Sequence, residues 1–260
     1  MEQPCRVGSK RRDISAVRNY VQGYGYAMYH ARRYVELLVL LRGYVESDTA
    51  VLDIGPGTLT GLIRRDFGRP VDTLGFCADE STPEGRSFSF DLNDAQHEER
   101  WRTDLPAYDL IVMAEVIEHL HTAPRLVLLF LRTLLKPGGV LIVQTPNAAS
   151  LHKRVKLLFG LNPYEMIRED SSNPGHFREY TRRELFCVAK EAGFGVEGWR
   201  AHDYFDFRYM SHAEGLNRPT PRSRVFGSIM NVTYRMMPGS LKPGQSIILR
   251  RPDDPECQPS

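Results

Sequence analysis

The stretch from Val51 to Gly61, VLDIGPGTLTG, constrains the fold of this chain more than any other part of the sequence. An apolar run ends in an acid and then in two glycines one residue apart, and a helix-like segment follows. This order is typical of a first strand that enters a glycine turn and a helix, where an open α/β sheet binds a nucleotide-like ligand. Gly55 and Gly57 have no Cβ, so a ligand can approach their backbone closely. Asp53 offers an acceptor for an amine or a hydroxyl.

The same loop argues against two kinds of nucleotide site. It contains no Lys and no GK[ST] motif, so a P-loop that grips a triphosphate is excluded. The third glycine of the dinucleotide fingerprint would fall at Thr60, which disfavours an NAD-dependent dehydrogenase.

Composition sets the scale of the molecule. A chain of 260 residues is long enough for one α/β domain with additions. Its net charge of +2 argues neither for nor against a polyanionic partner. Its four cysteines lack CxxC spacing, so we expect them to be reduced thiols. We recognise no targeting segment and no run long enough to span a bilayer. We therefore expect a soluble, cytoplasmic protein without a membrane span.

Apolar segments alternate between strand and helix periodicity. After the first strand, strands are predicted at 71–76, 88–91, 110–114, 140–145, 194–199 and 245–251, and helices at 62–67, 124–135, 150–159, 181–192 and 225–237. A turn at Lys136–Gly139 separates a helix from the next strand. Thr181 and Glu184 form a capping box at a helix start. The alternation predicts a parallel sheet with crossover helices on both faces.

We expect a single domain over residues 1–260. Residues 14–46 would form an N-terminal helical cap divided at Gly23 and Gly25, residues 47–200 the core, and residues 201–244 an insertion. The last strand would be 245–251, and the tail 252–260 is expected to be disordered.

Four stretches together resemble the class I S-adenosylmethionine-dependent methyltransferases over residues 50–199. They are VLDIGPG, FDLND, YDLIVMAEVIEHL and LLKPGGVLIVQTPN, in the order and spacing of that family. The run GHFREYTRRELFCVAKEAGF is similar to the segment after the fifth strand in a subgroup that contains ubiquinone-pathway O-methyltransferases and small-RNA 2′-O-methyltransferases. The resemblance implies a three-layer, Rossmann-like sheet of seven mostly parallel strands, with an antiparallel last strand, N-terminal helices and an inserted cap segment before that strand.

The resemblance also implies S-adenosylmethionine as cofactor. Its methionine end would lie against Gly55 and Gly57, with Asp53 oriented to its amino group. The family's acid after the second strand is replaced by Cys77, so Asp79, just beyond, is the candidate for the ribose. The remaining implied contacts are Asp91 and Leu92 at the adenine, and Ala114 and Glu115 on the floor near the sulfonium.

Methyl transfer to a hydroxyl requires the protein to position the acceptor and to help remove its proton. His119, His121 and His176 are candidate bases by location, and we select His119 and His176 as the catalytic pair. Lys153, Arg154 and Lys156 lie on or beside one face of the helix after Asn147. One hypothesis is that they hold an anionic acceptor, such as a phosphorylated or carboxylated small molecule, but a solvated face is the favoured interpretation.

Glu115, Glu118 and His119 have i, i+3, i+4 spacing, so on one helical turn their side chains would point the same way. With His176 they would make a mixed oxygen and nitrogen set that suits a divalent cation such as Mg, Mn, Fe or Zn. The resemblance to the small-RNA subgroup implies a metal that holds the acceptor diol. Alternatively, the EVIEHL segment caps a helix and forms part of the cofactor pocket, and no metal is bound.

The function predicted first is O-methylation of a small-molecule or glycan acceptor. An RNA 2′-O-methyltransferase is the alternative, and it would need a broad basic surface that the near-zero net charge disfavours, so nucleic acid is an unlikely partner. A catalytically inactive module that only binds a partner is a third hypothesis. The joint presence of Asp53, Gly55, Gly57 and Asp91 argues against it.

Overall fold

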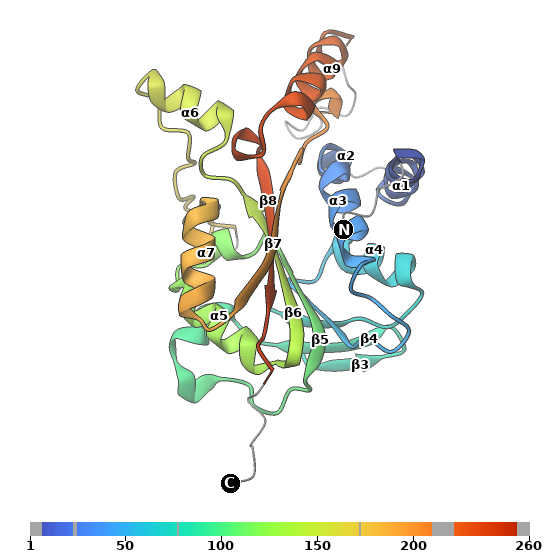
Figure 1. Cartoon of the computed structure of the whole chain (residues 1–260), viewed down its shortest axis with the longest axis vertical. Coiled ribbons are helices and arrows are strands. Elements are labelled where there is room, and N and C mark those ends of the chain that lie inside the picture. Colours follow the sequence, from blue (N-terminus) through green and yellow to red (C-terminus); the bar gives the residue numbers. More distant parts are fainter. Residues whose placement is uncertain (1–6, 23–24, 77, 172, 210–220, 254–260) are drawn as a thin grey trace.

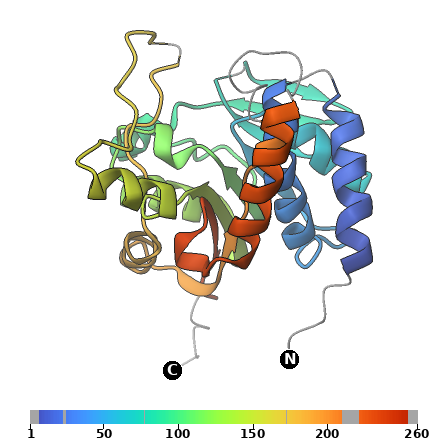
Figure 2. The same cartoon turned by 90° about the horizontal axis from the view of Figure 1, so that it is seen from above.

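A central sheet with helices on both faces forms the molecule in the computed structural model, which describes residues 7–22, 25–76, 78–171, 173–209 and 221–253 (Figures 1 and 2). The sheet has eight strands in the order β3-β4-β2-β1-β5-β6-β8-β7. None of the helices described combines the length and the apolar character that crossing a membrane requires.

The strands of the parallel part are β4, β2, β1, β5 and β6, and β8 runs antiparallel to both of its neighbours, β6 and β7. Their bounds are β1 (Val51–Ile54), β2 (Asp72–Gly75), β3 (Glu80–Thr82), β4 (Gly85–Ser89), β5 (Tyr108–Ala114), β6 (Leu135–Pro146), β7 (Gly195–His202) and β8 (Gly244–Arg250). The mostly parallel α/β fold with an antiparallel last strand is thus confirmed. The short edge strand β3, antiparallel to β4, is additional.

Two apolar cores lie on opposite faces of the sheet. One core contains α1 (Val7–Tyr20), α3 (Ala31–Leu41) and α4 (Thr58–Phe67), and the other contains α5 (Pro124–Thr133) and α7 (Arg182–Glu191). In β5, Leu110 and Val112 face the first core while Ile111 and Met113 face the second. A strand covered on both faces needs apolar residues at every position, which explains the uninterrupted apolar run predicted as a central strand.

The remaining helices are α2 (Gly25–Tyr29), α6 (Leu151–Leu158) and α9 (Pro221–Met236), with short 3₁₀ helices η1 (Leu92–Gln96), η2 (Glu98–Arg100), η3 (Ile117–His119), η4 (Phe207–Tyr209) and η5 (Gly239–Leu241). The N-terminal helices are therefore three, and α1 begins before residue 14. Several predicted features lie outside the described residues: the division at Gly23, the residue Cys77, part of the 201–244 insertion and most of the tail.

Two local predictions were wrong. The strand predicted at 88–91 lies at 85–89, because Asp91 instead caps η1 by accepting a hydrogen bond from Asn93 N at 2.8 Å. The turn predicted at 136–139 lies within β6. There Leu135 already pairs with Tyr108, and the register shifts before the main ladder begins.

The capping box of α7 is present as predicted. Glu184 N donates to Thr181 Oγ1 at 3.3 Å, and Thr181 N donates to Glu184 Oε2 at 2.8 Å. The box fixes the start of a helix whose inner face, Leu185 and Ala189, is buried against the sheet.

We expect Thr181→Ala to lower the free energy of unfolding by about 1 kcal/mol, because the N-terminal amides of α7 lose a side-chain acceptor. Thr181→Ser keeps the hydroxyl and serves as the control, with a stability close to that of the wild type. Urea denaturation followed by circular dichroism measures both. Equal stability of the alanine and serine variants would contradict the role given to the cap.

Candidate functional site

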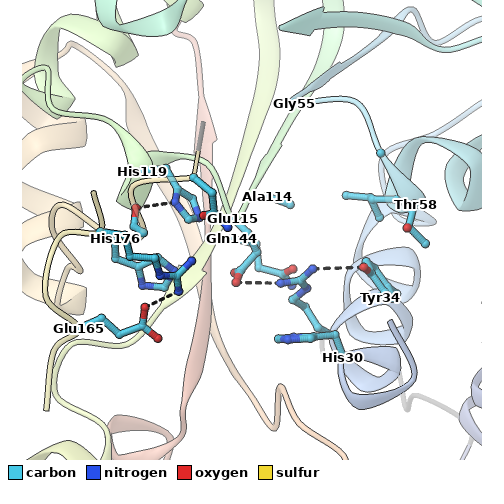
Figure 3. Close-up of a pocket in the computed structure, with 16 residues that line it drawn as sticks. His30, Tyr34, Gly55, Thr58, Ala114, Glu115, His119, Gln144, Glu165 and His176 are labelled. Carbon is cyan, nitrogen blue, oxygen red and sulfur yellow. Dashed lines mark hydrogen bonds and ion pairs between the residues drawn. The ribbon is translucent and has the colours of Figure 1, made fainter. Parts of the chain in front are cut away.

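A cavity of about 510 Å³ opens at the carboxyl ends of the parallel strands (Figure 3). Its walls come from the turn after β1, the ends of β5 and β6, the α2–α3 region and the segment 165–176. The strand order reverses at β1, because β2 lies on one side of it and β5 on the other. Open α/β sheets bind ligands beside such a reversal, at the carboxyl ends of the strands. Figure 3 shows His119 and His176 on one side of the cavity and Tyr34 and Thr58 on the other.

The glycine turn after β1 forms one wall. Gly55 has φ +76°, and a Cβ there would lie 3.0 Å from Val116 Cγ2, so a larger residue is both strained and crowded. A Cβ on Gly57 would meet no atom within 4 Å, which leaves its backbone open to a ligand. Thr60 stands where the dinucleotide fingerprint has its third glycine. Its hydroxyl accepts from Gly57 N at 2.9 Å and donates to Asp53 Oδ2 at 2.7 Å, which ties the turn to the end of β1.

Asp53 lies behind this turn and does not itself line the cavity. It is 1% exposed, and its second carboxylate oxygen, Oδ1, has no hydrogen-bond partner within the described residues. Burial raises the pKa of Asp53 to about 7, against the opposing hydrogen bond from Thr60. A buried carboxylate oxygen without a partner is costly, and an ammonium group, directly or through water, would satisfy it. The turn therefore fits the amino-acid end of the implied cofactor.

Three residues predicted to contact the adenosine end lie away from the cavity lining. Asp79 is exposed, accepts from Ser89 N at 2.6 Å and pairs with Arg102 at 2.9 Å. Asp91 is engaged in capping η1, and Leu92 is buried in the core. Their cofactor contacts stay predictions, and the ion pair of Asp79 with Arg102 gives no support to the ribose role.

Ala114 and Glu115, by contrast, line the cavity at the end of β5. Glu115 has φ +57°, the one positive φ outside glycine among the described residues, and its Oε2 lies 2.8 Å from Arg33 Nη1 of α3. Both side chains are largely buried. Since Glu115 precedes η3, the assumption that it shares one helical turn with Glu118 and His119 was wrong. Its carboxylate faces the N-terminal helices instead.

Glu118, His119 and His176 form a second cluster, and their ligand atoms lie within 4.8 Å of one another. Glu118 is fully buried. Its Oε2 accepts from Thr145 Oγ1 at 2.9 Å, and its Oε1 has no hydrogen-bond partner in the described part of the chain. The pKa of Glu118 is raised mainly by burial and, to a smaller extent, by the nearby charge of Glu115.

The hydrogen bonds of the two histidines define which ring nitrogens are available. His119 Nδ1 lies 2.8 Å from Gly175 O, and His176 Nδ1 lies 3.2 Å from Glu179 Oε1. A carbonyl or an ionised carboxylate can only accept, so each Nδ1 carries a proton and each neutral ring has its lone pair on Nε2. Burial is the largest cause that lowers the pKa of His176, to about 4, and the electrostatic effect of His119 lowers it as well. The His176 ring is therefore neutral at pH 7. The two rings meet edge to face with centroids 4.7 Å apart.

Some important residues around this cluster were not predicted as site residues. Glu179 accepts a hydrogen bond from His176 Nδ1 and also forms a buried ion pair with Lys153 of α6. It therefore links the histidine to this helix. The expected solvated face was therefore wrong for Lys153, and burial lowers its pKa to about 8. Arg33 was missed as well, because nothing in the sequence pairs it with Glu115. His121, a candidate by location, does not line the cavity and packs against Phe177.

The comparisons with known proteins agree with this arrangement. A family model described as a methyltransferase domain matches residues 26–197. A relative from Mycolicibacterium smegmatis, described as a probable S-adenosylmethionine-dependent methyltransferase, is 33% identical over 150 residues, which are 56% of this chain and 52% of the relative. The chain thus spans about half the length of that relative.

Solved structures share the fold at low identity. The cyclase SpnF matches with a TM-score of 0.54 and 16% identity over 96% of each chain. Phosphoethanolamine N-methyltransferase 2 of Haemonchus contortus, solved with phosphomonomethylethanolamine and S-adenosylhomocysteine, matches with a TM-score of 0.54 and 13% identity, over 95% of this chain and 59% of that one. The family model covers the glycine turn, β5 and the histidine cluster together. This chain therefore belongs to the class I S-adenosylmethionine-dependent methyltransferase family.

Proposed function

We propose that this chain uses S-adenosylmethionine to methylate an oxygen of a small-molecule or glycan acceptor. The observation that carries the proposal is that the glycine turn of β1 and the side chains of His119 and His176 line one cavity. The bound cofactor would supply a methyl group activated by the positive charge of its sulfur. The protein's task is then to hold the acceptor in line and to take up its proton.

On the cofactor side, Gly55 and Gly57 would hold the methionine end, and Asp53 would accept from its amino group. Ala114 and Glu115 would form the floor beside the reacting methyl group. The carboxylate of Glu115 is already paired with Arg33, so the floor has no uncompensated charge that would need a cationic acceptor. This favours a neutral or weakly acidic acceptor such as a hydroxyl over an acceptor that carries its own positive charge.

On the acceptor side, His119 and His176 would act as the proton acceptor. Each ring has Nδ1 fixed by a hydrogen bond, so Nε2 is the basic atom, and His176 stays neutral at pH 7. A positioned imidazole that removes a proton in the transition state contributes about 10²–10⁴-fold to the rate.

The cavity argues for a small acceptor group rather than RNA. Its volume of about 510 Å³ would be shared by the cofactor and the acceptor. The two arginines of the lining, Arg33 and Arg168, are paired with Glu115 and Glu165, so they do not extend as a free basic surface.

A second candidate role for the histidine cluster is to hold a divalent cation. Two imidazoles and the buried Glu118 Oε1, which has no hydrogen-bond partner among the described residues, offer the donor types that Mn, Fe or Zn prefer. Glu179 would orient His176 through its hydrogen bond to Nδ1. Such a cation would lower the pKa of an acceptor hydroxyl. Glu115, predicted as a fourth ligand, is engaged by Arg33 and would have to leave it to take part.

We expect the affinity for S-adenosylhomocysteine to rise with pH between 6 and 8. The pKa of Asp53 is raised to about 7, so its carboxyl is protonated below that pH and cannot attract the ligand's ammonium group. Well below the pKa, affinity should fall by up to about tenfold per pH unit. Asp53→Asn should bind more weakly and show no such slope in calorimetry. A flat affinity for the wild type from pH 6 to 8 would exclude the role of Asp53.

We expect wild-type protein to transfer label from methyl-labelled S-adenosylmethionine to members of a panel of hydroxylated small molecules and glycans. His119→Ala and His176→Ala should each lower turnover by about 10²-fold or more, because the proton acceptor is damaged. Both variants should keep their affinity for S-adenosylhomocysteine, and His121→Ala is the matched control with full turnover. Label transfer confined to amines, or unchanged turnover in both histidine variants, would refute the proposal.

Elemental analysis of the same preparations separates the two roles of the cluster. If the cluster holds a cation, the wild type retains Mn, Fe or Zn, EDTA abolishes turnover, and His176→Ala releases the metal. If purified protein contains no metal and EDTA has no effect, the cation is excluded and the histidines act as the base.

A further inference from the structure

Helix α9 exposes its apolar face to solvent. Val225, Ile229, Val232 and Met236 are spaced by four, three and four residues, so they form one stripe along the helix, and all are exposed, Met236 to 81%. The opposite stripe, which the fold buries, consists of Gly227, Asn231 and Tyr234. The usual distribution is thus reversed for this stripe, because the four apolar side chains face solvent while Asn231 is buried.

Helix α6 shows the same reversal. The residue it buries is Lys153, in the ion pair with Glu179, whereas Leu158 is 80% exposed. The exposed apolar side chains continue beyond the helix, where Phe159 and Leu161 are followed by Met166 and Ile167, with Met166 exposed to 82%. Isolated apolar residues on a surface are ordinary, but a contiguous group of this kind marks an interaction surface.

Both groups lie at the end of the molecule where the cavity opens. Figure 1 shows α6 and α9 protruding above the sheet at the same end, on either side of it. The segment after α6 supplies Glu165 and Arg168 to the cavity lining. On the other side, the inner face of α9 stacks on η4, with the Tyr234 and Phe207 rings 5.1 Å apart.

The α2–α3 region connects η4, and with it α9, to the cavity lining. Phe207 packs edge to face on Tyr29, with centroids 6.3 Å apart, and the neighbouring His30 lines the cavity. We define the apolar rim as the exposed residues of both groups: Val155, Leu158, Phe159, Leu161, Met166 and Ile167 around α6, and Val225, Ile229, Val232 and Met236 of α9.

The charges on the two helices have one sign. The sequences of α6 and α9 contain no Asp or Glu, whereas the segment after α6 has exposed Glu165, Glu169 and Asp170 near Met166 and Ile167, with Glu165 paired to Arg168. Arg154 and Lys156 of α6 and Arg224 and Arg235 of α9 are exposed next to the rim. Apolar side chains flanked by basic ones on an exposed helix are the pattern that binds the interface of an anionic bilayer, where the apolar residues enter the acyl boundary and the cations meet the headgroups.

We propose that the apolar rim docks this protein on the surface of an anionic lipid bilayer, with the mouth of the cavity facing the headgroups. A bilayer fits this surface better than a protein partner, because the two halves of the rim flank the cavity on separate protruding elements. A rigid partner that covered both halves would close the mouth, whereas a fluid interface admits both helices and leaves an acceptor free to enter. Docking of this kind needs no spanning helix.

The test is flotation of the full chain with vesicles of phosphatidylcholine alone or of equal parts phosphatidylcholine and phosphatidylglycerol. We expect binding to the anionic vesicles that weakens with added salt. Leu158→Glu/Phe159→Glu and, separately, Ile229→Glu/Val232→Glu should each reduce the bound fraction at least about tenfold. All four side chains are exposed, so both variants should fold, which circular dichroism and S-adenosylhomocysteine binding verify.

The matched control is Lys190→Glu on α7, an exposed residue whose replacement changes the net charge by the same amount as either double variant. It should float like the wild type. Three results would overturn the proposal. One is no flotation of the wild type, and another is an equal loss in the Lys190 variant, which would reduce the effect to net charge. The third is concentration-dependent self-association without vesicle binding that the rim variants abolish, since the rim would then contact a second copy.

Discussion

The ion pair between Arg33 and Glu115 holds the site together. It joins α3 of the N-terminal helices to the end of β5, in the centre of the sheet, at 2.8 Å and largely out of water. Two buried charges are tolerated only with good mutual geometry, and the loss of either partner leaves the other uncompensated. Glu115 has a positive φ and pairs with Arg33, whereas the carboxylate of Glu118 accepts from Thr145. Within the one cavity, Glu115 therefore belongs to the side of the N-terminal helices and Glu118 to the histidine cluster.

Much of the fold and part of the site follow from local sequence. The apolar run of β5, the glycine turn and the Thr181 capping box each depend on neighbours within a few residues, and each is present as predicted. The pairs Arg33–Glu115 and Lys153–Glu179 depend on segments far apart in the chain, and many charged residues would have been equally good partners. Spacing alone also suggested a helical turn at Glu115, because it does not show where a strand ends.

Which face of α6 and α9 is buried could not be predicted from the sequence, for a different reason. Helical periodicity identifies an apolar stripe, but it does not show what covers that stripe. The usual assumption that the stripe faces the core is wrong in α9, where Asn231 packs inward and donates to Asp206 at 2.9 Å. The fold can bury Asn231 and Asp206 together because Asp206 also pairs with Arg208, at 2.7 Å. This polar network and the stacking of Tyr234 on Phe207 together hold the helix.

The two rim helices are each connected through their inner faces to cavity residues. In α6 the buried Lys153 pairs with Glu179, and Glu179 in turn fixes the proton of His176 on Nδ1. In α9 the contact runs through Tyr234 to η4 and on to Tyr29 of α2, which directly precedes the cavity residue His30. Because Lys153 is the buried cation beside the carboxylate that orients the imidazole, a displacement of α6 would leave Glu179 without this charge partner next to His176.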